Sequence, residues 1–175
     1  MTALATPRLI LRAPRPDDAP GYALAVGDYE VARWLTPLPW PYTLAMAAEW
    51  LRQAPANTPE RALFMVELPG RGLIGCVSLL SELGFWIARP HWGRGYATEA
   101  AAALIGWHFA GCAADAIACS AQRDNAASLR VQARLGFRAV GREQRFSQAL
   151  QYNVDHVLSR LTRAGWLARE NERCA

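Results

Sequence analysis

RPHWGRGYATEA, residues 89–100, places a glycine on each side of an arginine and then runs straight into an alanine-rich stretch. Alanine is the strongest helix former, so the segment predicts a glycine loop that opens directly into a helix. The first turn of a helix carries unpaired N–H groups and partial positive charge, which together attract phosphate. Gly93 and Gly95 let the backbone approach an anion closely, and Ala97 keeps the third position small. The loop therefore predicts a pyrophosphate site, with a plain structural turn as the alternative.

Two other phosphate-binding loops do not fit this sequence. A dinucleotide-binding G-x-G-x-x-G needs glycine where Thr98 stands, and no acidic residue follows a next strand at the usual spacing. The chain contains no lysine, which excludes both a Walker-type loop and Schiff-base chemistry. Its net charge of +4 comes from 19 arginines that are scattered along the chain. Because they form no basic block, nucleic acid is not expected as a partner.

The length of 175 residues fits a single domain spanning residues 1–175. The cysteines are irregularly spaced and form no C-x-x-C pair, so neither a metal site nor a redox motif is predicted; they are Cys76, Cys112, Cys119 and Cys174. The N-terminus lacks the apolar core of a signal peptide, and no apolar run reaches membrane-spanning length. We therefore expect a soluble cytoplasmic protein that binds no metal and no membrane.

Hydrophobic periodicity predicts the elements that precede the strands around the loop. They are a strand at residues 8–12, a short helix within residues 14–28, a helical continuation at residues 29–35, and a helix that starts at Thr43 and runs to residue 53. Asp17 or Asp18 is the expected N-cap of the first helix, and Thr43 of the last. Residues 36–42 contain three prolines, so they are predicted to form an irregular aromatic loop.

From residue 62 the pattern changes to strands, predicted at 62–68, 72–80 and 82–88. The next expected elements are a helix at 97–109 ended by Gly111, a strand at 116–121, a helix at 126–135 ended by Gly136, a strand at 137–143, a strand within 151–161 and a terminal helix at 162–171. The two strands that flank the first of these helices should be parallel neighbours joined by a right-handed crossover. The predicted class is a mixed α/β sheet, with antiparallel strands followed by a parallel β-α-β crossover.

Residues 125–137, NAASLRVQARLGF, give the loop a context about thirty residues further on. The two segments together resemble the GNAT superfamily of acetyl-CoA-dependent N-acetyltransferases, which combine a (Q/R)-x-x-G-x-(G/A) loop with an N-x-x-(S/A) helix ending in L-G-F. Trp92 stands where many members have Gln or Arg. That departure, WGRGYATEA as a whole, the opening TPRLILRAPRPDDA and the closing DHVLSRLTRAGW resemble the RimJ/RimL-type branch.

The resemblance implies that backbone N–H groups of the loop hold the pyrophosphate of acetyl-CoA. The pantetheine arm would lie between the splayed strands at 82–88 and 116–121 and pair with backbone near Trp86 and Ile87. Asn125 would contact the arm, and Ser128 would lie near the thioester sulfur. The expected binding residues are Trp86, Ile87, Trp92, Gly93, Arg94, Gly95, Tyr96, Ala97, Thr98, Asn125 and Ser128. Arg130 and Arg134 are either partners of the 3′-phosphate or an exposed helix face, and the exposed face is favoured.

Acetyl transfer to an amine requires a base for the amine and an acid for the departing thiol. Ser128 is the candidate acid, because no tyrosine is clearly placed for that role. Glu82 is the candidate base, since strand alternation puts Glu82 on one face with Gly84 and Trp86; a solvated edge carboxylate is the alternative. No catalytic role is assigned to the histidines or to Cys119; His108 and Cys119 are expected in the core, and His156 is expected on the opposite face from Asp155.

The acceptor amine is left open by the sequence. Trp34, Leu38, Trp40 and Tyr42 could line an acceptor wall or simply pack their loop onto the domain. The leading hypothesis is direct acetyl transfer from acetyl-CoA to a primary amine, either a protein N-terminus or a small-molecule amine. The alternative is an acyl-CoA-binding sensor or interaction module without catalysis. The resemblance is also compatible with a homodimer.

Overall fold

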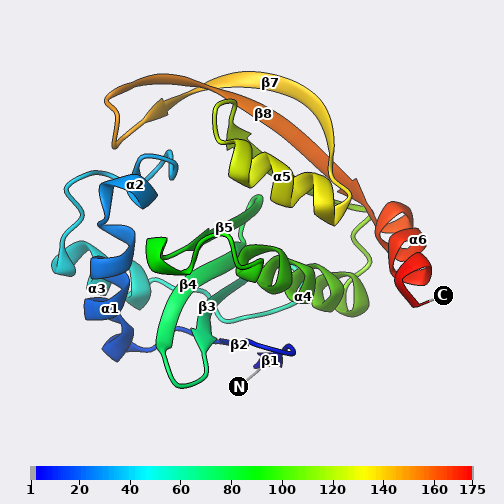
Figure 1. Ribbon diagram of the computed structural model, residues 1–175, viewed down its shortest axis with the longest axis horizontal. Coiled ribbons are helices and arrows are strands. Elements are labelled where there is room, and N and C mark those ends of the chain that lie inside the picture. The colour runs from blue at the N-terminus through cyan, green and yellow to red at the C-terminus, as the bar shows by residue number, and fades with distance from the viewer. Residues whose placement is uncertain (1–2, 175) are drawn as a thin grey trace.

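The computed structural model describes residues 3–174. Within them, eight strands form one sheet in the order β1-β2-β3-β4-β5-β6-β8-β7 (Figure 1). The strands are β1 (Leu4–Ala5), β2 (Ile10–Arg12), β3 (Ala62–Leu68), β4 (Gly72–Leu79), β5 (Leu83–Ile87), β6 (Ala116–Gln122), β7 (Arg138–Ser147) and β8 (Tyr152–Thr162). Neighbouring strands are antiparallel apart from β5 and β6, which are parallel. The predicted mixed sheet with one parallel crossover is confirmed.

Helices cover both faces of the sheet. The helical segments are η1 (Pro16–Asp18), α1 (Ala19–Val26), α2 (Tyr29–Ala32), α3 (Leu44–Arg52), η2 (Arg89–His91), α4 (Tyr96–Gly111), α5 (Ala126–Leu135) and α6 (Arg163–Cys174). Figure 1 shows α1 and α3 on one side of the central strands and α4 on the other. Successive residues of β3 divide accordingly: Phe64 packs in the core that includes α4, and Met65 in the core that includes α1 and α3. β3 is thus buried on both faces, which explains its continuous apolar sequence.

The parallel pair is joined only at one end. β4 and β5 pair along the whole of β5, from Leu83 to Ile87. β5 and β6, in contrast, share the single pair Leu83↔Cys119 and separate beyond it. The result is a gap that is closed at Leu83 and opens toward the C-terminal ends of both strands, as the resemblance implied.

Two expected helix signals have a different role in the fold. Gly111 was predicted to follow the end of its helix, but α4 includes Gly111 and its C-cap is Cys112. A side chain at Gly111 would collide with the ring of Pro59, so close packing is the reason for glycine there. Asp18 occupies the N-cap position of α1 but makes no side-chain cap bond, because its carboxylate binds Arg12 instead.

Other predicted boundaries are confirmed by their caps. Thr43 Oγ1 accepts a hydrogen bond from Met46 N at 3.2 Å and begins α3. Gly136 ends α5 with φ of 92°, a left-handed conformation that favours glycine. The helix predicted at 29–35 is only the four-residue α2, separated from α1 at Gly27 and capped by Asp28.

The hairpin of β7 and β8 arches over α5 toward the segment after α2 (Figure 1). Its tip is tied to the proline-rich loop, because Gln148 N donates to the carbonyl oxygen of Thr36 at 2.9 Å. None of the helices in residues 3–174 is long and apolar enough to cross a membrane.

Candidate active site

Residues 92–98, hereafter the cofactor loop, link η2 to α4. Gly93 has φ of 73° and Gly95 has φ of 81°, both in the left-handed region that favours glycine. No side chain caps α4, and its first backbone bond runs from Glu99 N to Gly95 O at 3.0 Å. The N–H groups at the start of the helix are therefore free to bind an anion. The backbone fits the pyrophosphate role expected of it.

Trp92 and the neighbouring His91 of η2 lie at the start of the cofactor loop. Trp92 donates its indole N–H to the carbonyl oxygen of Ile87 at 2.6 Å, which fixes the loop against the end of β5. His91 Nδ1 is buried without a hydrogen-bond partner among the described residues. Burial, followed by the nearby charges of Arg94 and Arg71, holds the pKa of His91 below its ordinary value. His91 is thus favoured as a neutral group beside the anion site.

The edge of β5 that faces the gap offers backbone groups to a ligand. Ala88 N donates to Ile74 O at 2.7 Å, so the backbone groups of Ala88 point to β4. Because strand residues alternate, those of Trp86 also point to β4, whereas those of Phe85 and Ile87 point to the gap. Beyond Leu83 no pair joins β5 to β6. Of the two predicted positions Ile87 therefore faces the gap, together with Phe85, which the sequence reasoning did not name.

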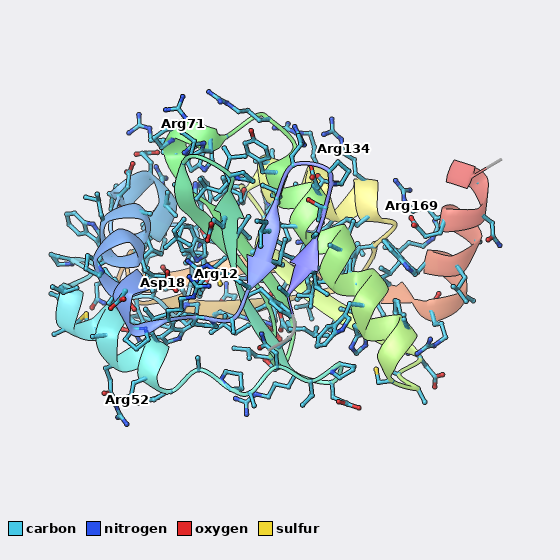
Figure 2. The ribbon with its side chains drawn as sticks, turned by 90° about the horizontal axis from the view of Figure 1, so that it is seen from below. Arg12, Asp18, Arg52, Arg71, Arg134 and Arg169 are labelled. Carbon is cyan, nitrogen blue, oxygen red and sulfur yellow. The ribbon has the colours of Figure 1, made fainter. Side chains whose placement is uncertain are left out.

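Asn125 and Ser128 are brought together at the open end of the gap. Asn125 Oδ1 accepts a hydrogen bond from Ser128 N at 3.0 Å and caps α5. The Asn125 amide nitrogen and the Ser128 hydroxyl make no hydrogen bond within the described part of the chain. Both groups remain available to a ligand in the gap, while Arg134 on the same helix points outward at the edge of the molecule (Figure 2).

Glu82 lies at the closed end of the gap, just before β5. Its carboxylate accepts hydrogen bonds from Ser120 Oγ at 2.6 Å and from Arg145 Nη2 at 2.5 Å. Burial alone would raise the pKa of Glu82, but the hydrogen bonds from Arg145 and Ser120 outweigh it and hold that pKa below its ordinary value. Glu82 is therefore an ion-paired carboxylate, and it does not contact Ser128, which lies at the other end of the gap.

A cavity of about 550 Å³ opens beside Glu82. Its charged lining residues are Glu82, Asp115, Glu143, Arg145 and Arg160, a formal total of −1 from three carboxylates and two guanidinium groups. Cys119 also lines the cavity, so the cavity reaches the closed end of the gap. Burial raises the pKa of Cys119 to about 12, which leaves its thiol neutral and inert. A cationic group carried on a small apolar stem fits this lining.

A buried polar network joins the proline-rich loop to the hairpin. Thr36 Oγ1 lies 2.7 Å from His156 Nε2, and Gln122 Nε2 donates to the carbonyl oxygen of Arg33 at 2.8 Å. Burial, with the charge of Arg145, lowers the pKa of His156, so the ring is neutral at pH 7. Asp155 points away and lies 3.9 Å from Arg123. The expected separation of His156 from Asp155 is confirmed.

The aromatic residues of the proline-rich loop pack onto neighbouring helices. Trp40 donates its indole N–H to Gly27 O at 3.1 Å, and its ring centre lies 5.0 Å from that of Tyr29. Tyr42 packs on Tyr22 with ring centres 6.2 Å apart. Packing of the loop, one of the two readings left open by the sequence, accounts for these contacts.

Residues 8–138 match the acetyltransferase (GNAT) domain family. The chain belongs to this family. Among solved GNAT-like structures, Mycobacterium smegmatis RimJ in complex with CoA-disulfide is 22% identical with a TM-score of 0.78, covering 93% of this chain and 87% of that one. A GNAT-family acetyltransferase from Bacillus anthracis is 20% identical with a TM-score of 0.78, covering 92% of this chain and 98% of that one.

The microcin C7 self-immunity acetyltransferase MccE, solved in complex with acetyl-CoA and AMP, is 16% identical. Its TM-score is 0.75, and the alignment covers 90% of this chain and 93% of that one. At these identities the likenesses establish a shared GNAT fold.

Two arginines in this GNAT site were not predicted from the sequence. Arg145 reaches Glu82 from β7, and Arg8 reaches Glu99 and the Arg94 carbonyl group from the turn between β1 and β2. Each contact joins residues more than 60 positions apart. No local pattern in the sequence signals such a pairing.

Proposed function

We propose that the protein transfers the acetyl group of acetyl-CoA directly to a primary amine. One observation supports the proposal: the gap between β5 and β6 opens at the end of β5 that precedes the glycine loop, and a cavity lined by three carboxylates and two arginines reaches its closed end. This arrangement supplies a place for a phosphate-bearing donor at one end and for a cationic acceptor at the other. A binding module without catalysis would not need the carboxylate-lined cavity.

The residues that would hold acetyl-CoA lie along the gap. The N–H groups of residues 93–98 would bind the pyrophosphate, and the backbone of Phe85 and the N–H of Ile87 would pair with the arm, since the Ile87 carbonyl oxygen accepts from Trp92. The Asn125 amide nitrogen would contact the arm at the open end. Bound acetyl-CoA supplies a thioester whose carbonyl carbon the acceptor amine attacks, forming the C–N bond as the C–S bond breaks.

The side chains then handle the protons. Because Glu82 and Ser128 lie at opposite ends of the gap, Glu82 would take the amine proton through water, and the Ser128 hydroxyl would supply a proton to the departing thiolate. Coenzyme A is a tolerable leaving group, because a thiol of this kind has a pKa of about 8.5. A weak acid such as Ser128 is therefore sufficient.

The ion pair of Glu82 bears on the acceptor. A carboxylate whose pKa is held low is a weak base, so it suits an amine that is readily deprotonated. At pH 7 an α-amine costs about 1 to 1.4 kcal/mol to deprotonate, whereas a lysine amine costs about 4.6 kcal/mol. We therefore propose an α-amine acceptor, either a protein N-terminus or a small molecule, over a lysine side chain.

The decisive test combines binding with turnover. Calorimetry should show acetyl-CoA binding to the wild type, and thiol release should rise with at least one member of a panel of peptides and small α-amines. Binding without release for any amine would favour a sensor, and absence of binding would refute the proposal.

Gly93→Asp tests the cofactor loop itself. Asp tolerates a left-handed backbone, and its carboxylate would repel phosphate, so acetyl-CoA affinity should fall at least tenfold, or about 1.4 kcal/mol. Gly70→Asp is the matched control, since Gly70 has φ of 76°, Gly93 has φ of 73° and neither has an atom within 4 Å of an added Cβ. Equal affinities of the two variants would contradict the phosphate assignment.

A further inference from the structure

Arg8, in the turn between β1 and β2, spans from the N-terminal segment to the cofactor loop. Its Nη1 donates to the carbonyl oxygen of Arg94 at 2.9 Å. Its Nε and Nη2 contact Glu99 Oε2 at 2.7 and 2.6 Å. The guanidinium carbon lies 4.7 Å from the centre of the Tyr96 ring. Arg8 thus connects a loop carbonyl, an aromatic ring and a carboxylate of the first turns of α4.

Glu99 makes this contact rigid from the other side. Its Oε2 binds the Arg8 side chain, and its Oε1 accepts hydrogen bonds from Thr6 Oγ1 at 2.6 Å and from the Arg8 backbone N–H at 2.9 Å. Burial alone would raise the pKa of Glu99, but the bonds from Thr6 and Arg8 outweigh it and keep that pKa below its ordinary value. The carboxylate is therefore ionised at neutral pH and holds the guanidinium plane in one orientation.

The bond to Arg94 determines which way one peptide group faces. In a trans peptide the C=O of one residue and the N–H of the next point in opposite directions. With the Arg94 carbonyl turned to Arg8, the Gly95 N–H points to the other side of the loop. Gly95 leaves this peptide free to rotate, since the rotation changes the φ of Gly95 and glycine tolerates both positive and negative φ. A fixed external partner is needed to select one orientation.

We propose that Arg8 is a positioning residue for the cofactor loop, holding the Arg94–Gly95 peptide so that the Gly95 N–H faces the pyrophosphate. The inference rests on the proposed function, because it assumes that the loop binds acetyl-CoA. Arg8 acts here through the loop backbone, and its charge alone does not suffice. The N-terminal segment, which lies outside the strand–loop–helix unit, thereby becomes part of the donor site.

Two substitutions separate positioning from charge. Arg8→Gln removes the charge and the bridge, and Arg8→Lys keeps the charge but has no planar fork to join Glu99 and Arg94 at once. Both should weaken acetyl-CoA binding about tenfold or more, as expected for loss of a hydrogen bond from a charged group. The kcat at saturating acetyl-CoA should stay within about twofold, because the reacting groups are untouched.

Arg71→Gln is the matched control. Arg71 is an exposed arginine close enough to lower the pKa of His91, yet it forms no hydrogen bond within residues 3–174. Its replacement should change acetyl-CoA affinity by less than about threefold, and that change should vanish at high salt. The loss caused by Arg8→Gln should persist at high salt, since it comes from backbone geometry.

A direct readout follows the peptide itself. The Gly95 amide resonance in ¹⁵N-labelled protein without ligand should shift or broaden in both Arg8 variants and stay unchanged in Arg71→Gln. Unfolding temperatures, measured alongside, show whether each variant is folded at the assay temperature. If Arg8→Gln is unfolded at the assay temperature, the test rests on the affinity and the amide spectrum of Arg8→Lys.

The outcomes distinguish the inference from the function on which it rests. If the wild type binds acetyl-CoA and Arg8→Lys binds equally well, positioning is overturned and the function stands. If the Gly95 resonance is unchanged in folded Arg8→Gln, the inference is likewise overturned. If the wild type does not bind acetyl-CoA, both are overturned.

Discussion

Arginine and carboxylate groups form a cluster at two places in the molecule, and the clusters differ in burial. Arg12 binds Asp18 at 2.7 Å and Glu67 at 2.6 Å, and its side chain is 12% exposed. Arg145 binds Glu82 at 2.5 Å and is 32% exposed. Figure 2 shows Arg12 and Asp18 side by side within the body of the molecule, whereas Arg52 projects from its edge. The same chemical pair therefore occupies two environments.

The difference in burial indicates a different role for each cluster. The Arg12 cluster joins β2, η1 and β3, and Arg12 and Asp18 are enclosed by the surrounding structure, whereas Glu67 is part-exposed. Loss of one partner there leaves a charge without compensation where water cannot replace it. The Arg145 cluster borders the cavity, where water or a ligand can replace a lost partner. We expect the first cluster to serve stability and the second to serve the chemistry of the site.

Arg12→Leu should have the largest effect on folding. It leaves the Asp18 carboxylate, which is 8% exposed, without a charged partner and with only the Arg15 N–H among its described hydrogen bonds, and should lower the free energy of unfolding by about 3 kcal/mol. Urea unfolding at pH 7 measures the change. Arg52→Leu is the control, because Arg52 and Glu49 form a pair of the same chemistry that is 72% and 51% exposed. That variant should show no measurable change.

The effect of Arg12→Leu should also depend on pH. The bonds to Asp18 hold its pKa below the ordinary value against the opposing effect of burial. A depressed pKa contributes stability above the unfolded-state value of about 3.9 and loses it as pH falls through the folded-state value. The difference between wild type and variant should therefore shrink below about pH 4. A difference that is constant from pH 7 to pH 3 would contradict the ion-pair explanation.

Glu82→Gln tests the role of the Arg145 cluster in the chemistry of the site. If Glu82 accepts the amine proton, kcat should fall about 100-fold, equivalent to about 2.7 kcal/mol on the barrier. The free energy of unfolding should change by less than about 1 kcal/mol, because the pair with Arg145 is part-exposed. Thiol release at saturating acetyl-CoA gives kcat, and calorimetry should show unchanged acetyl-CoA affinity.

Glu143→Gln is the matched control for Glu82→Gln. Glu143 also binds Arg145 and also lines the cavity, but it lies on β7 and makes no hydrogen bond with Ser120. Its kcat should fall less than about tenfold, below the range for a general acid–base group. Similar losses in the two variants would mean that cavity charge, rather than a base at Glu82, supports turnover.

Sequence reasoning located the elements and the two motifs because their signals are local. Gly93, Gly95 and Gly136 all have the positive φ that their positions required. Alternation along the predicted strand put Glu82, Gly84 and Trp86 on one face, and the structure places Trp86 in the core shared with α1 and α3. The splayed strands followed from the resemblance, and the single pair at Leu83 confirms them.

What could not be predicted depends on contacts between distant segments. Asp18 was expected to cap α1, but its carboxylate binds Arg12 from β2 and the backbone N–H of Arg15 at the start of η1. Gly111 was expected to follow the end of its helix, but it lies within α4, where Pro59 packs against it. Glu82 could be placed on a face, yet its partner on β7 lies 63 residues away. Partner choice of this kind is a property of the fold rather than of local sequence.

Arg145→Gln should have the smallest effect on folding and sharpens the comparison most directly. Because the pair is part-exposed, the free energy of unfolding should change by less than about 0.5 kcal/mol. The pKa of Glu82 should rise, since the hydrogen bonds from Arg145 oppose the effect of burial. The pKa of His156 should rise too, since the charge of Arg145 lowers it. NMR titration of both side chains measures the two shifts, with Arg123→Gln as a control that leaves them unchanged. An unaltered Glu82 titration would mean that Ser120 alone sets its pKa, and the cluster would then resemble an ordinary surface pair.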